Sequence, residues 1–170
     1  GGADGFVLQV KTNDIDTVEW MQTFGGINDE KVSSIQVLDT GQLILGGTYS
    51  STGFFGTNSS QSLGMNDCFV AFLNNDGNWQ ELLSFGGGGN DELTALVPLS
   101  NDNFMVVGNF FGSFQCGNKK VSSNGKSDGF VALINGAGSC ISLKSYGGVG
   151  SDSINSLSHI DGQIYFTGTF

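Results

Sequence analysis

The chain has 170 residues, a formal net charge of −10 at pH 7 and only six lysine and arginine residues. Phosphate groups are bound by clustered cations, so this balance argues against a nucleic acid or an anionic membrane surface as a partner. An apolar content of 38% is too high for a disordered chain, and no stretch approaches the roughly 20 apolar residues that span a bilayer.

Turn residues divide the first third of the chain into short segments. Asparagine, aspartate and glycine favour tight turns, and such turns are expected at residues 12–14 and 39–41. The segments around them show no 3.6-residue apolar period. They are therefore predicted to be strands.

The middle third is the most regular part of the chain. Aromatic and β-branched runs predict four strands over residues 67–73, 79–85, 93–99 and 104–110. Residues 111–127 are expected to add one short strand or hairpin. The last third repeats this plan, with turns at 135–138 and 161–162.

Three motifs recur at intervals of about 61 residues. They are D-x-F-V at residues 4–7, 67–70 and 128–131, [FY]-G-G at 24–26, 85–87 and 146–148, and G-x-[FY] at 47–49, 108–110 and 168–170. Such a period is typical of repeat architectures. The sequence predicts one all-β repeat array over residues 1–170. Each unit has about four antiparallel strands, like a blade of a β-propeller; the units are 1–66, 67–127 and a truncated 128–170.

The number of units is too small for a ring, because propellers have about four to eight blades. An incomplete ring is expected, since the sequence stops before the connecting segment of its third unit. The chain is either a fragment of a larger propeller or part of an oligomer or fibre that shares strand edges. A closed, three-fold, trefoil-like fold is a further alternative.

The combined pattern D-x-F-V-A-x-[LI], a turn, a strand ending in [FY]-G-G and a later G-x-[FY] resembles the bacterial β-propeller repeat (SBBP repeat) family. Residues 125–133 are the best match, and the resemblance covers essentially the whole chain. It departs from the family at Val10 and Lys11 and at Cys68. The family occurs in secreted and surface proteins, including those of Bacteroidota. The resemblance implies a propeller in an extracellular or cell-surface setting, and it transfers no catalytic residue.

Acidic residues recur after the Gly-Gly turns, at Asp29, Asp91 and Asp152. One interpretation is calcium bound in acidic, glycine-rich loops. The favoured interpretation is that each aspartate accepts backbone N–H bonds and fixes its own turn. No cofactor is otherwise expected.

The three cysteines are Cys68, Cys116 and Cys140. Each is an isolated replacement within the repeat, so small buried residues are the favoured interpretation. A Cys116–Cys140 disulfide is the alternative. Metal ligation is disfavoured because the chain has no C-x-x-C spacing and a single histidine, His159.

Candidates for an exposed contact surface are Trp20, Phe54 and Phe55, which lack strict equivalents in the other units. Asn58 begins an N-x-[ST] sequon. Thr17 and Ser153 lie in segments that resemble the short O-glycosylation motif of Bacteroidota.

The sequence contains no convergent set of acid, base and nucleophile in a recognised context. We therefore predict that the protein is not an enzyme. The predicted function is a structural and interaction module of a surface scaffold, adhesin or filament. Its partners would be further blades, a second copy joined through strand edges, or another protein. The alternative is a propeller that binds a carbohydrate or another ligand.

Overall fold

The computed structural model describes residues 2–170, which form strands and turns and contain no helix. The predicted all-β class is therefore confirmed. No helix in this part of the chain could cross a membrane. The strands are β1 (Gly5–Lys11), β2 (Asp14–Gly26), β3 (Glu30–Val37), β4 (Leu43–Tyr49), β5 (Thr52–Phe55), β6 (Asn58–Gln61), β7 (Asp67–Leu73), β8 (Trp79–Phe85), β9 (Glu92–Pro98), β10 (Phe104–Cys116), β11 (Lys119–Ile134), β12 (Cys140–Tyr146), β13 (Ser153–Ile160) and β14 (Gln163–Thr169).

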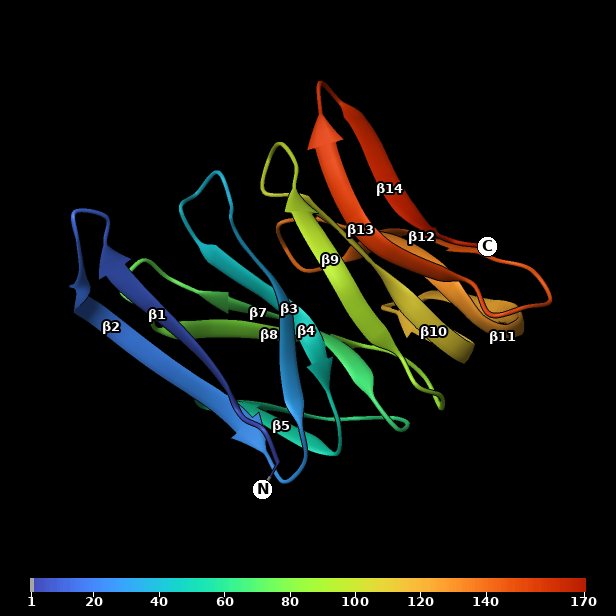
Figure 1. Ribbon diagram of the computed structural model, residues 1–170, viewed down its shortest axis with the longest axis horizontal. Coiled ribbons are helices and arrows are strands. Elements are labelled where there is room, and N and C mark those ends of the chain that lie inside the picture. The colour runs from blue at the N-terminus through green and yellow to red at the C-terminus, as the bar shows by residue number, and fades with distance from the viewer. Residues whose placement is uncertain (1) are drawn as a thin grey trace.

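The strands form four antiparallel sheets. In chain order, the first sheet is β1-β2-β5-β6, and the second and third are complete four-stranded sheets in the orders β3-β4-β7-β8 and β9-β10-β11-β12. The fourth contains only β13 and β14. The sheets follow one another across the molecule, with β3 next to β9 and β9 next to β13 (Figure 1).

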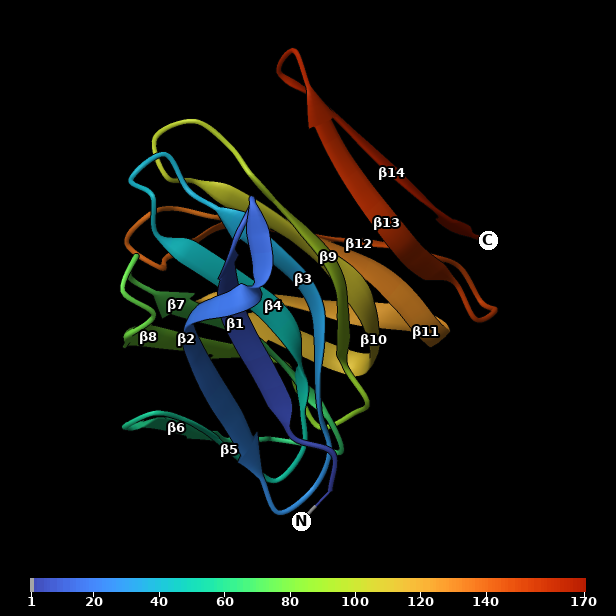
Figure 2. The ribbon, with the colours of Figure 1, turned by 60° about the vertical axis from the view of Figure 1, so that its left-hand side comes forward.

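The two ends of this row do not meet. β1 and β2 lie at one end and β13 and β14 at the other in Figure 1, and the two pairs of strands are also well separated in Figure 2. The strands of residues 2–170 therefore do not close a ring.

The sheets are out of phase with the sequence repeat. The sheet β3-β4-β7-β8 takes two strands from the unit at residues 1–66 and two from the unit at 67–127. Each complete sheet is thus made from two consecutive units, so neighbouring units cannot separate without breaking a sheet.

A hairpin joins each sheet to the one before it. β5 and β6 leave the second sheet after β4, and β5 pairs with the end of β2, where Gly25 lies opposite Phe54. In the next unit, the far ends of β10 and β11 form the same hairpin. Its Gln115 exchanges backbone hydrogen bonds with Gly86. The expected connecting hairpin is therefore present, and Gly112, with a φ of 80°, breaks the pairing at its base.

The core consists of two clusters, one on each side of the second sheet. The first contains Val7, Phe24, Leu45, Tyr49, Phe55, Phe69, Ala71 and Leu73, and the second is centred on Phe72, Phe104, Phe110, Phe114 and Phe130. Successive residues of β7 point to opposite faces, and all seven are buried because both faces are covered.

The glycine of the G-x-[FY] motif is required by close packing. A Cβ added at Gly47 would lie 2.1 Å from the carbonyl oxygen of Lys31 and 2.7 Å from the Phe69 ring. At Gly108, the corresponding distances to the Glu92 oxygen and the Phe130 ring are 2.0 and 2.7 Å. Larger side chains would therefore push the central strands apart.

Candidate functional site

A polar cleft of about 630 Å³ opens between the first, second and third sheets. Its walls are formed by Gly2, Ile27, Asn28, Asp29, Lys31, Thr48, Ser50, Asn66, Asn90 and Glu92. Amide, hydroxyl and charged groups dominate this wall. The cleft thus offers donors and acceptors suited to a hydroxyl-rich ligand.

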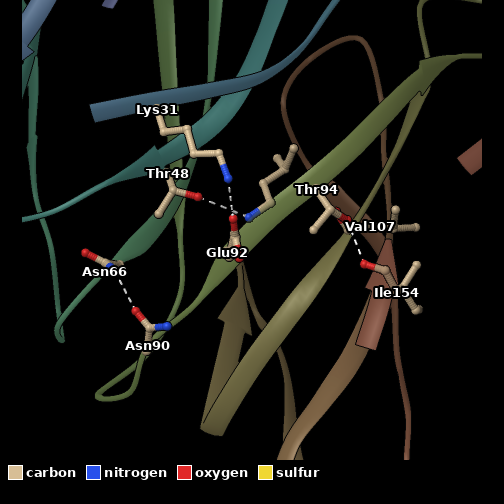
Figure 3. A network of polar contacts seen from close by, with 9 residues as sticks. Lys31, Thr48, Asn66, Asn90, Glu92, Thr94, Val107 and Ile154 are labelled. Carbon is tan, nitrogen blue, oxygen red and sulfur yellow. Dashed lines mark hydrogen bonds and ion pairs between the residues drawn. The ribbon is translucent and has the colours of Figure 1, made fainter. Parts of the chain in front are cut away.

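The polar groups of the cleft already bond across the joint between sheets (Figure 3). Lys31 Nζ lies 2.7 Å from Glu92 Oε1, and the backbone N–H of Leu93 donates to Thr48 Oγ1 at 3.3 Å. Nearby, Asn66 Nδ2 donates to Asn90 Oδ1 at 2.5 Å. A ligand in the cleft would compete with these bonds.

The contact between the third and fourth sheets is made by a hydroxyl group of β9. Thr94 Oγ1 lies 2.9 Å from the carbonyl oxygen of Ile154 and 3.3 Å from that of Val107 (Figure 3). Asn109 Oδ1 accepts the backbone N–H of Ile154 at 2.7 Å. These bonds tie β13 to the third sheet.

The repeated carboxylate after each Gly-Gly turn is buried and holds its own loop. Asp91 accepts the N–H of Gly87 at 2.6 Å and that of Phe111 at 3.3 Å. Asp152 accepts the N–H of Gly148 at 2.6 Å. Each carboxylate thus accepts a backbone N–H of its own loop, and Asp91 also ties that loop to β10.

In the first unit this position belongs to Glu30 rather than Asp29. Glu30 lies opposite Tyr49 at the start of β3 and is buried. Asp29 is exposed and accepts the N–H of Ala3 at 2.8 Å. The loop after Gly26 has the same length as its counterparts, so Asp29 lies one residue before the equivalent position. The signal that identifies Glu30 is the constant spacing of positions 30, 91 and 152.

Burial shifts the acidity of these groups. It raises the pKa of Asp91 to about 7, although the hydrogen bonds from Gly87 and Phe111 act in the opposite direction. Burial also raises the pKa of Glu30, although the backbone N–H of Gly26 acts in the opposite direction. These acids therefore favour the protonated form more strongly when folded than when unfolded.

A second pair of buried acids anchors the connecting hairpins. Asp67 accepts the N–H of Leu63 at 2.9 Å, and Asp128 accepts that of Asn124 at 3.0 Å. Burial raises the pKa of Asp67. The D-x-F-V aspartate thus fixes the return of its hairpin into the next strand.

The acids proposed as calcium ligands do not converge. Asp29, Asp91 and Asp152 lie in three separate loops, and residues 2–170 contain no group of three or more His, Cys, Asp or Glu arranged to hold a metal ion.

The cysteines occupy two different environments. Cys68 is fully buried in β7, where burial raises its pKa strongly. Cys116 and Cys140 are brought together as free thiols that share a hydrogen bond, which lowers the pKa of Cys140 and raises that of Cys116. The pair suggested by the sequence is therefore adjacent in space.

The three aromatic contact candidates separate on burial. Phe55 is only 1% exposed and belongs to the core, so its assignment to an exposed surface is wrong. Phe54, its neighbour on the opposite face of β5, is 51% exposed. Trp20 is half-buried, and its Nε1 donates to the carbonyl oxygen of Asn75 at 3.2 Å.

The candidate glycosylation sites are all partly buried and hydrogen-bonded. Asn58 Nδ2 lies 3.5 Å from the Gln80 carbonyl oxygen, and Thr17 Oγ1 donates to Asp14 Oδ2 at 2.5 Å. Ser153 Oγ lies 2.8 Å from Thr169 Oγ1. A glycan at any of these three positions would displace an existing contact.

Sequence reasoning missed the most exposed aromatic residues of the repeat. Phe6 and Phe170 are 64% and 98% exposed, although both belong to the recurring motifs.

Comparison of the chain with protein-family models and with curated protein sequences finds no match.

Proposed function

We propose that the chain is a non-catalytic structural and interaction module, built from blades of a β-propeller and acting in an extracellular scaffold, adhesin or filament. The supporting observation is the repeated joint between sheets. Glu30, Asp91 and Asp152 take the same buried position, and Phe55 and Phe114 pack in equivalent hairpins. A contact that recurs between successive sheets builds an extended surface. An active site instead needs one unique set of catalytic residues.

The proposal assigns no catalytic activity. The single histidine, His159, is exposed in β13 opposite Ile164. The buried acids Asp91 and Asp152 accept backbone N–H groups of their own loops. The SBBP resemblance supports the extracellular setting, which antibody labelling of intact source cells would test.

An extended chain tests the blade architecture. Residues 109–147 would be fused after Gly168, because Gly108 and Gly168 hold the same place in their units. The added residues would supply the hairpin and two strands that β14 lacks. We expect a clear rise in the free energy of unfolding, since β14 gains a partner. No rise would contradict the proposal.

The second candidate function is glycan binding in the polar cleft between Lys31 and Asn90. A glycan array probed with the wild-type chain and with Asn90→Ala tests it. Binding that disappears in this variant would favour the alternative. If the wild-type chain binds no glycan on the array, the result supports the structural role.

A further inference from the structure

Two strands of residues 2–170 have one unpaired edge where their counterparts have none. β4 pairs with β3 and β7, and β10 pairs with β9 and β11, whereas β14 pairs only with β13. In the same way β7 and β11 have neighbours on both sides, whereas β1 pairs only with β2. Unpaired strand edges accept further strands.

β14 and β1 are the repeat equivalents of strands that pair with each other elsewhere in the chain, β4 with β7 and β10 with β11. Gly47, Gly108 and Gly168 each lie beside the bulge in their strand pair, so they are equivalent. Gly47 lies opposite Phe69, and Gly108 lies opposite Phe130. The equivalent partner of Gly168 is Phe6. We infer that β14 pairs antiparallel with β1 of a second copy of the chain, with Gly168 opposite Phe6.

Aromatic side chains on the two edges support this register. Tyr49 and Phe69 lie edge to face with ring centroids 6.4 Å apart, and Phe110 and Phe130 repeat this at 6.5 Å. All four rings are no more than 1% exposed. Their counterparts are the exposed residues Phe170 and Phe6. Pairing of β14 with β1 would bring these two rings together and remove both from water.

β1 and β14 lie at opposite ends of the row of sheets, so they do not pair with each other, and a second copy of the chain offers each of them a matching edge (Figure 1). Each joint creates a four-stranded sheet, β13-β14-β1-β2, shared between two copies. Two copies joined at both ends contain six four-stranded sheets, of which four lie within single copies and two are shared. This number lies within the usual four to eight blades of a propeller. We therefore expect a closed dimer. The net charge of −10 opposes this association, so added salt strengthens it.

Mixed cysteine variants test the register directly. Leu8 and Phe166 are directly opposite in the inferred pairing, and both are partly exposed in the single chain. In a Cys140→Ser background, a mixture of Leu8→Cys and Phe166→Cys chains should form a disulfide-linked dimer on mild oxidation. A mixture of Leu8→Cys and Tyr165→Cys is the matched control, because Tyr165 points to the other face. Equal cross-linking in both mixtures would overturn the register.

Sedimentation of the uncross-linked chain tests the association itself. We expect a concentration-dependent dimer that Phe170→Asp weakens at least tenfold and Ile141→Asp leaves unchanged, because Ile141 is exposed on β12, a strand of the third sheet that contains neither of the two edges. A chain that stays monomeric at its highest soluble concentration would overturn the inference. The inference rests on the proposed function, but its failure is distinguishable. A monomer that still gains stability on fusion of residues 109–147 contradicts only the dimer.

Discussion

Phe55 stacks on Phe24 with ring centroids 4.9 Å apart and 13° between the ring planes. Phe24 belongs to the [FY]-G-G motif at the end of β2, which continues to Gly26, whereas Phe55 ends the short strand β5. Their contact clamps the connecting hairpin onto the preceding sheet. The hairpin is thus a structural part of the joint between sheets, and its aromatic residue contributes to the core.

Replacement of Phe55 by alanine should destabilise the fold by about 3–5 kcal/mol, the usual cost of removing a buried phenylalanine. Phe54→Ala is the matched control, because its side chain is 51% exposed and should change stability by less than about 1 kcal/mol. Urea unfolding followed by tryptophan fluorescence measures both values. Equal effects would contradict the assignment of Phe55 to the core.

The free energy of unfolding should depend on pH through Asp91, whose pKa is raised to about 7 by burial. A raised pKa means that the folded state binds the proton more tightly. The contribution is fully present below the usual value of 3.8 and is lost as the pH rises to about 7. One titrating group changes the free energy of unfolding by up to about 1.4 kcal/mol per pH unit.

Asp91→Asn should flatten this profile, because asparagine does not titrate. Urea unfolding of both proteins between pH 4 and 8, at steps of about one unit, measures the slopes. The protonated carboxyl has one carbonyl acceptor, as asparagine has, so the stability of the variant is expected to be close to that of the wild type at acidic pH and to exceed it at pH 8, where the wild type buries a charge. Parallel profiles would contradict the raised pKa.

The ion pair in the polar cleft should contribute little to stability. Lys31 and Glu92 have side chains 67% and 39% exposed, so solvent screens their attraction. A double-mutant cycle with Lys31→Ala and Glu92→Ala should give a coupling energy below about 1 kcal/mol that falls with salt. A coupling of several kcal/mol, insensitive to salt, would show that this joint depends on the pair.

Mild oxidation should link Cys116 to Cys140, since the two thiols are in contact and the pKa of Cys140 is lowered by its hydrogen bond with Cys116. Intact mass and peptide mapping would identify the bond, and closing this loop should stabilise the fold by about 3 kcal/mol. Cys68 is the internal control, because it is completely buried. Modification of Cys68 before Cys140 would contradict these environments.

The regular strands of the middle unit could be predicted from the sequence. The predicted ranges 67–73 and 79–85 coincide with β7 and β8, because turn residues flank clear apolar runs. The range 104–110 covers only the first half of β10, which continues to Cys116. That extension pairs with residues far along the chain, and local propensity does not report such pairing.

The candidate site was predictable only in part. The recurrence of acids identified Asp91 and Asp152, and the structure places both in their loops as acceptors of backbone N–H groups. Asp29 was chosen by residue type, whereas the fold uses Glu30, because backbone register rather than chemical identity sets the position. The exposure of Phe6 and Phe170 could not be read from the motifs, which are those of buried residues elsewhere in the chain.

Hydrogen exchange of the backbone amides tests most directly the claim that the chain is a row of sheets with unpaired edges on β1 and β14. Amides of β7 and β11, which have partners on both sides, should exchange slowly at every protein concentration. Amides of β14 should exchange quickly in dilute solution and become protected as the concentration rises. Protection of β14 equal to that of β10, and independent of concentration, would contradict the account.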